Sequence, residues 1–168
     1  AGDGSLVLKV YFKRTYTVIY KPGTQGTFEQ QTTENIVYNT ITPEFVGEKT
    51  CNPGYEFVGW DKTVADKVTE DAVYIAQWKP STNTRYKVEF YYQENGEYKN
   101  IPNDIDNRTG TTNEVAAVTD ADKLPDSKVA PKDATYVLDK VAPNVLSGVI
   151  AGDGSLVLKV YFKRTYTV

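Results

Sequence analysis

The feature that most constrains this chain is an internal repeat that brackets it. Residues 1–18 read AGDGSLVLKVYFKRTYTV, and residues 151–168 have the same sequence at all 18 positions. The 168-residue chain therefore spans one period of 150 residues and the first 18 residues of the next. Near-identical modules in tandem build long objects in which each module contacts mainly its neighbours. We expect a piece of such an array, and the absence of methionine, even at position 1, also indicates a longer gene product. A strand copied onto one end by design is the alternative.

The repeated segment reads as a turn followed by a β-strand, and it sets the phase of the array. The glycine-rich run 152–155 is a turn signal, and strict alternation follows over 156–163. We expect residues 1–14 to be an orphan last strand of the preceding repeat and 165–168 to start the next repeat. The alternation places four apolar side chains on the core face, namely Leu156, Leu158, Val160 and Phe162.

A second boundary divides the period into two modules. The polar run Lys79-Pro80-Ser81-Thr82-Asn83 follows one alternating segment and precedes another. We therefore expect module one at 15–80 and module two at 84–164, each with a small core of its own. Module one has 5 basic and 9 acidic residues and module two has 11 and 12, so neither net charge, −4 or −1, indicates a particular partner.

The composition favours a mainly β fold, α+β at most. The chain has 20 Thr, 20 Val and 13 Tyr, which are β-branched and aromatic residues that suit a pleated, half-buried surface. The 12 Gly and 8 Pro supply turns between short strands. Segment 113–123 is a candidate short helix with Asn113 as its N-cap, although its β-branched residues oppose this. We expect two small modules in tandem that form an elongated object.

Module one carries the motifs of a known repeat. Residues 54–60 read GYEFVGW, and residues 69–78 read TEDAVYIAQW. This pattern resembles the Listeria–Bacteroides repeat, also called the internalin B-repeat, although the spacer 25–45 is longer than usual in that family. The resemblance implies a small β-grasp-like fold on a secreted bacterial surface protein. We expect the motif aromatics to be core residues, and a bulge or close backbone approach at Gly59. The expected core residues are Tyr55, Phe57, Trp60 and Trp78.

Module two looks like the mucin-binding-protein type of repeat. The resemblance rests on YKVEFYY at 86–92, TGTT at 109–112 and GDGSLVLKVY at 152–161. It implies a second β-grasp-like module and suggests a glycan-stacking platform made by Tyr91, Tyr92 and Tyr98. Ordinary packing of these rings within a sheet is the alternative reading.

Metal and nucleophile chemistry have few candidates. The chain has no histidine and one cysteine, which removes histidine acid–base catalysis and dithiol chemistry. We expect no enzymatic activity and no cofactor. The loop carboxylates Asp120, Asp122 and Asp126 are weak Ca²⁺ candidates, and a solvated acidic loop is the default.

Two covalent modifications are considered, one at the single cysteine and one between side chains. Cys51 is interpreted as a small residue before a turn, with a reactive thiol or thioester as the alternative. An isopeptide bond between a lysine and an asparagine needs these two groups and an acidic residue to converge in an apolar pocket. Lys87 or Lys159 would be the nucleophile and Glu89 the acid, but Lys87 lies on the expected solvent-facing side of its strand.

These features favour a structural stalk repeat of a cell-wall-anchored bacterial surface adhesin, located outside the cell. The alternative is an adhesin module that binds mucin glycans or a host surface protein weakly in each repeat. The expected partners are neighbouring repeats of the same chain. The net charge of −3 and pI of about 5.1 argue against nucleic acid, and no segment is apolar enough for membrane insertion. We expect a monomer in which residues 1–14 can take part in a domain swap.

Overall fold

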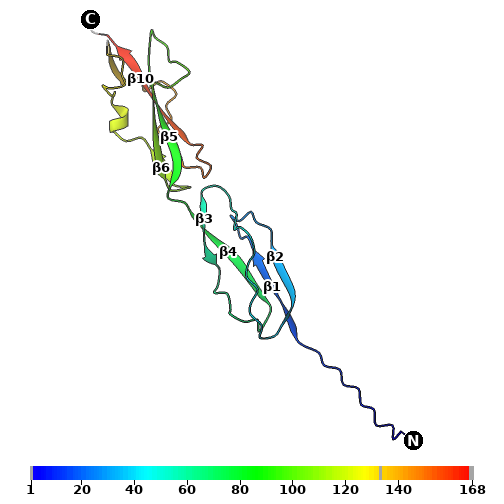
Figure 1. Cartoon of the computed structure of the whole chain (residues 1–168). Coiled ribbons are helices and arrows are strands. Elements are labelled where there is room, and N and C mark those ends of the chain that lie inside the picture. Colours follow the sequence, from blue (N-terminus) through cyan, green and yellow to red (C-terminus); the bar gives the residue numbers. More distant parts are fainter. Residues whose placement is uncertain (1, 133, 167–168) are drawn as a thin grey trace. The chain divides into compact units, whose positions relative to one another are not determined.

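The computed structural model describes residues 2–132 and 134–166, and β-strands dominate it (Figure 1). The chain divides into two compact units. Unit 1 runs to Cys51 and comprises Phe57–Trp78 as well, whereas unit 2 comprises Asn52–Glu56 and the chain from Lys79 onward. Each unit has its own hydrophobic cluster, and the mainly β architecture of small modules is confirmed.

The first four strands form one mixed sheet. They are β1 (Thr15–Lys21), β2 (Gln31–Val37), β3 (Tyr55–Trp60) and β4 (Ala72–Pro80), in the order β2-β1-β4-β3. β1 pairs antiparallel with β2 and parallel with β4. The parallel pair needs a long crossover, which the irregular segment between β2 and β4 and the strand β3 supply.

The core of unit 1 is aromatic. Tyr20, on β1, is almost fully buried and its ring centroid lies 4.7 Å from that of Trp60 and 5.2 Å from that of Tyr74. Its hydroxyl donates a hydrogen bond of 2.8 Å to the carbonyl oxygen of Pro43. Aromatic side chains bury a large area each, so a few of them can hold together a small unit.

Unit 2 holds a second four-stranded sheet, in the order β6-β5-β10-β8, and a two-stranded sheet of β7 and β9. β5 and β10 are central, and they pair parallel to each other. The bounds are β5 Thr84–Tyr92, β6 Asp104–Gly110, β7 Val115–Ala117, β8 Thr135–Leu138, β9 Ser147–Val149 and β10 Val157–Thr165, with a single 3-10 turn among the described residues, η1, at Ala121–Lys123.

The core of unit 2 is built on β10. Leu158, Val160 and Phe162 have no exposed surface, and Leu156 packs against the same cluster. The Phe162 ring stacks on Tyr92 at 4.9 Å between centroids. The apolar positions of the alternating repeated segment thus form the inward face of a central strand.

Several local features of the structure differ from what the sequence predicts. The predicted helix at 113–123 is strand β7 followed by η1, and Asn113 has φ of +70°, which no helix N-cap adopts. At Gly59 the close backbone approach is absent, because a Cβ there would meet no atom within 4 Å beyond its chain neighbours, whereas the φ of +142° favours glycine. β10 continues to Thr165, one residue past the expected junction, and Thr167 and Val168 lie outside the described residues.

Candidate functional site

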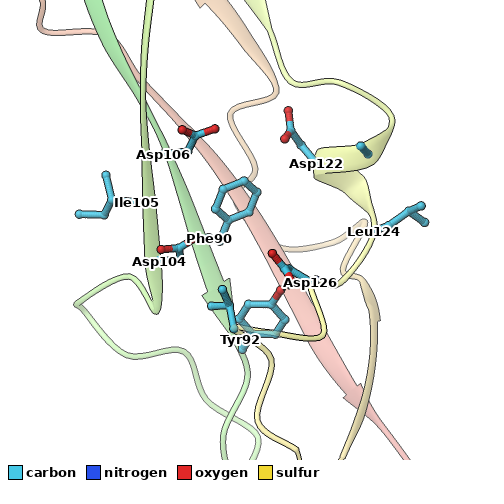
Figure 2. A pocket seen from close by; sticks show the side chains of 10 residues that line it. Phe90, Tyr92, Asp104, Ile105, Asp106, Asp122, Leu124 and Asp126 are labelled. Carbon is cyan, nitrogen blue, oxygen red and sulfur yellow. Dashed lines mark hydrogen bonds between the residues drawn. The ribbon is translucent and has the colours of Figure 1, made fainter.

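Unit 2 has a cleft between β5, β6 and the loop that carries η1 (Figure 2). Its volume is about 330 Å³. Phe90 and Tyr92 reach it from β5 because alternate residues of this strand point toward the core side. Four carboxylates surround these rings, two from β6 and two from the loop, and they are Asp104, Asp106, Asp122 and Asp126.

One wall of the cleft is fixed by a mostly buried ion pair. The Arg108 guanidinium binds Asp122 through two nitrogen–oxygen contacts of 2.8 and 2.7 Å, and its Nε donates to Asp106 at 2.8 Å. The side chains of Arg108 and Asp122 are 22% and 10% exposed. Hydrogen bonding to Arg108, and next the bonds from Thr119, outweigh burial and lower the pKa of Asp122 to about 2. Asp122 is therefore ionised and held in place at neutral pH.

The opposite wall is tied to the core through Tyr92. The backbone N–H of Asp126 donates a 3.0 Å hydrogen bond to the Tyr92 hydroxyl, and burial raises the pKa of that phenol. The Asp126 carboxylate accepts from the backbone N–H of Lys128 at 2.8 Å and remains exposed. Asp104, at the start of β6, is also exposed. The cleft thus presents fixed negative charge beside an aromatic floor, a setting suited to hydrogen-bond donors and to cations.

Two of the three weak Ca²⁺ candidates are paired with basic side chains. Asp120 is paired with Lys123 at 2.9 Å, and Asp122 is paired with Arg108, so neither carboxylate faces Asp126 as a joint ligand. Over residues 2–132 and 134–166, no group of three or more acidic or cysteine side chains is placed to hold a metal ion. Asp120 and Asp122 are thus paired within the loop and with β6, whereas the Asp126 carboxylate stays exposed.

The three tyrosines do not share one exposed platform. Tyr92 is 1% exposed and lies in the core, whereas Tyr91 is 5% exposed on the opposite face of β5. Tyr91 stacks on Tyr161 at 4.5 Å and donates to the Glu89 carboxylate at 2.7 Å. Tyr98 meets Tyr161 edge-on at 5.0 Å and donates to Asp139 at 2.8 Å. Burial first and these hydrogen bonds second raise the pKa of Tyr91 and Tyr98, so both stay neutral donors.

The motif aromatics of module one are half-buried. Trp60 packs against the hydrophobic cluster of unit 1, and the Trp78 indole N–H donates to the Pro22 carbonyl at 2.7 Å. The Phe57 ring lies 5.4 Å from both indoles. Tyr55 is half-buried as well, and its hydroxyl accepts a 2.7 Å hydrogen bond from the Asn113 side chain. The four rings serve packing and hydrogen bonding.

The covalent candidates lie in ordinary surroundings. Cys51 is half-buried, and its backbone pairs with that of Gly26 in a single antiparallel β-bridge. Lys87 is exposed, and Glu89 already accepts the Tyr91 hydroxyl. The Lys159 ammonium lies 6.0 Å from the Tyr91 ring centroid, which is a cation–π arrangement. Lys159 and Glu89 are register partners across β10 and β5, and the Tyr91 hydroxyl that bonds Glu89 makes their surroundings polar.

Sequence reasoning missed most of the cleft. Of its carboxylates, Asp122 and Asp126 were singled out for a different chemistry, and Asp104, Asp106 and Phe90 were not singled out at all. The available signal was the alternation of YKVEFYY, which places Phe90 on the same face as Tyr92. Nothing in the sequence indicated that the η1 loop lies across β5 and β6.

Comparisons with known proteins were made on the sequence and on the fold. No family model and no curated protein matches the chain. Among solved structures, the chain is similar to domains 3–4 of the Streptococcal High Identity Repeats in Tandem (SHIRT) type from a streptococcal cell surface protein. The match has 18% identity and a TM-score of 0.35, and it covers 90% of this chain and 99% of that one. The motif resemblances to the Listeria–Bacteroides and mucin-binding repeats remain predictions.

No helix among the described residues has the length and apolarity needed to cross a membrane.

Proposed function

We propose that the chain is a structural repeat of the stalk of a bacterial surface adhesin, anchored to the cell wall and acting outside the cell. The observation that carries the proposal is the 18-residue identity at a 150-residue offset. Its second copy is an integral central strand of unit 2, which supports a repeat that is in phase with the module. Each period then adds two small self-contained cores to a growing rod.

The side-chain chemistry supports a role in cohesion and not in catalysis. Asp122, whose pKa is lowered to about 2, is held by Arg108, so it is not poised to transfer a proton near neutral pH. The tyrosines with raised pKa are donors to Glu89 and Asp139 within the sheet. A catalytic acid or base needs a pKa near the working pH and access to substrate, and these groups have neither.

Protein made of one, two and four periods tests the stalk. Small-angle scattering should give a maximum dimension that grows by a constant increment with each period, while the thermal unfolding midpoint stays the same. A maximum dimension that stops growing after two periods would show that the periods fold back on each other, and would overturn the role as a spacer. The matched control is the same series with a flexible Gly/Ser linker between periods, whose dimension should grow more slowly.

The cleft favours a second function, weak ligand binding by each repeat. The exposed carboxylates Asp104 and Asp126 can accept hydrogen bonds from sugar hydroxyls, and the Phe90 ring offers an apolar face. Negative charge at the cleft repels an acidic glycan such as one ending in a sialic acid. Neutral mucin glycans are therefore the ligand class that we propose for this alternative, with many copies converting weak binding into useful avidity.

Mucin pull-down with one and four periods tests this alternative. Asp104→Asn and Asp126→Asn should each weaken retention on neutral glycans, because an amide replaces a charged acceptor in the cleft. Asp120→Asn is the matched control, since Asp120 belongs to the same loop but does not line the cleft. Equal retention of all variants would exclude the cleft as the binding site, and no retention at four periods would leave the stalk role alone.

A further inference from the structure

The repeated segment shows one stretch of sequence in two settings. Because residues 151–168 repeat residues 1–18, Arg14 and Arg164 are the same position in successive periods, and so are Thr15 and Thr165. The second copy of this stretch pairs with unit 2, and the first copy pairs with unit 1. In a tandem array, every internal copy has both neighbours at the same time.

The second copy contacts unit 2 on both sides of the strand. Gln93, which directly follows β5, donates its backbone N–H to the Phe162 carbonyl at 2.9 Å. The side-chain oxygen of Gln93 accepts from the Arg164 N–H at 3.3 Å. On the β8 side, Thr165 is the register partner of Thr135, and the two hydroxyl oxygens are 2.6 Å apart. Unit 2 therefore holds the strand as far as Thr165.

The first copy contacts unit 1 through other atoms of the same positions. The Arg14 carbonyl accepts from the Tyr38 N–H at 3.1 Å, directly after β2. On the way into β1, the Thr17 N–H donates to the Asp71 carboxylate at 2.7 Å, just before β4. β1 begins at Thr15, which is the position at which β10 ends in the other copy. The strand therefore passes from one sheet to the other without an unpaired residue.

The two sets of contacts do not compete for any atom. At the arginine position, Gln93 takes the N–H and Tyr38 takes the carbonyl. These two groups of one strand residue point to the same side, and those of the next residue point to the other side. Gln93 and the Tyr38 backbone thus share one side of the strand, whereas Thr135 and Asp71 share the opposite side. One strand can therefore satisfy both modules simultaneously.

We infer, on the basis of the tandem array proposed above, that β10 of one period and β1 of the next are a single unbroken strand belonging to two sheets. The end of unit 2 that carries Gln93 and Thr135 is the docking surface for unit 1 of the next period, which presents Tyr38 and Asp71. Because hydrogen bonds to the two modules meet at one position, this junction has no free linker. Consecutive periods are then fixed in register and in rotation about the strand.

A two-period protein, in which residue 168 is followed by a second copy of residues 19–168, contains one complete junction. With Cys51→Ser in both periods, spin labels are attached at Lys140→Cys of the first period and Glu34→Cys of the second, both exposed positions. Pulsed electron paramagnetic resonance should give a narrow distribution of distances between the labels. A flexible Gly/Ser linker inserted after Thr165 should widen that distribution by about twofold or more.

Gln93→Ala in the first period tests the docking surface itself and should also widen the distribution. The same substitution in the second period is the matched control, because no module follows it there, and it should leave the distribution unchanged. The thermal midpoints of these two variants should agree, since each loses the same hydrogen bonds within one copy of unit 2.

Two results would overturn the shared strand. One is a natural two-period protein with a distribution as wide as that of the linker variant, and the other is an equal effect of Gln93→Ala in either period. Small-angle scattering of the same samples separates this outcome from failure of the stalk. A maximum dimension that still grows with each period, together with a wide distribution, refutes the junction and leaves the stalk in place.

Discussion

At the scale of single residues, unit 2 is held together by a few saturated polar contacts around an apolar core. Arg108 joins β6 to the η1 loop through Asp122, and Tyr92 joins β5 to the same loop through the Asp126 backbone. A mostly buried charge is costly when its partner is removed, because the remaining charge has no water to solvate it. The free energy of unfolding should therefore depend on the Arg108–Asp122 pair.

We expect Asp122→Asn to lower the free energy of unfolding by about 2 kcal/mol at pH 7. The loss stays moderate because Asp106 still accepts a hydrogen bond from Arg108. The pKa of Asp122 in the folded chain, about 2, is below its ordinary value of 3.8, so its contribution is full above about pH 4 and disappears as the pH falls toward 2. Urea unfolding of both proteins from pH 7 to pH 2 should show the difference shrinking across that interval. Asp120→Asn, with a fully exposed side chain, is the control. A difference that does not change with pH would contradict the ion-pair explanation.

At the scale of elements, one repeated sequence has two structures. In the second copy it forms a turn and the buried central strand β10, whereas in the first copy the described residues 2–14 are exposed. β10 has β5 and β8 on its two sides, whereas residues 2–13 have no sheet partner among the described residues. The difference cannot come from propensity, because the sequences are identical. It comes from tertiary contacts, which usually outweigh intrinsic strand preference.

A matched pair of substitutions measures this difference directly. Leu158→Ala should cost about 3 kcal/mol, because it removes a fully buried side chain and leaves a cavity in unit 2. Leu8→Ala changes the same residue in the same local sequence and should cost less than about 0.5 kcal/mol. Chemical unfolding of both variants checks the values. Comparable losses would mean that the N-terminal copy is packed in solution.

Removal of the N-terminal segment tests whether residues 1–13 contribute to the stability of the fold. A chain that begins at Arg14 should keep its thermal midpoint within about 1 °C, since the exposed segment contributes little buried area. Arg14 is retained because its carbonyl accepts a 3.1 Å hydrogen bond from the Tyr38 N–H. Calorimetry of the two chains makes the comparison, and a fall of several degrees would show that residues 1–13 are integral to the fold.

At the scale of the whole molecule, the chain contains two units with separate hydrophobic clusters. The cluster of unit 1 centres on Tyr20 and Tyr74, and that of unit 2 centres on Leu158 and Phe162. Small cores of this size hold only a modest free energy of unfolding each, so a tandem array gains length without gaining a single large core.

The two indoles allow the units to be followed separately. Trp60 and Trp78 both belong to unit 1, so tryptophan fluorescence should report the unfolding of that unit alone. We expect Leu158→Ala to shift the transition seen by far-UV circular dichroism while the fluorescence midpoint stays within about 0.2 M urea of the natural chain. Tyr20→Ala should do the reverse and move the fluorescence midpoint. Equal shifts of both signals in either variant would show that the units unfold as one.

The sequence alone determined where most strands lie, because alternation and turn residues are local properties of the chain. It indicated Tyr55–Trp60 and Ala72–Trp78, and it identified the inward face of the strand at 156–162. Strand partners depend on contacts far apart in the chain, so the parallel pairs β1–β4 and β5–β10 and the short strand β9 emerged only from the tertiary structure. The fold also buried Tyr91 and placed the η1 loop beside Phe90, and so only the three-dimensional arrangement created the cleft. Periodicity tells which side chains share a face, but burial depends on what packs against that face.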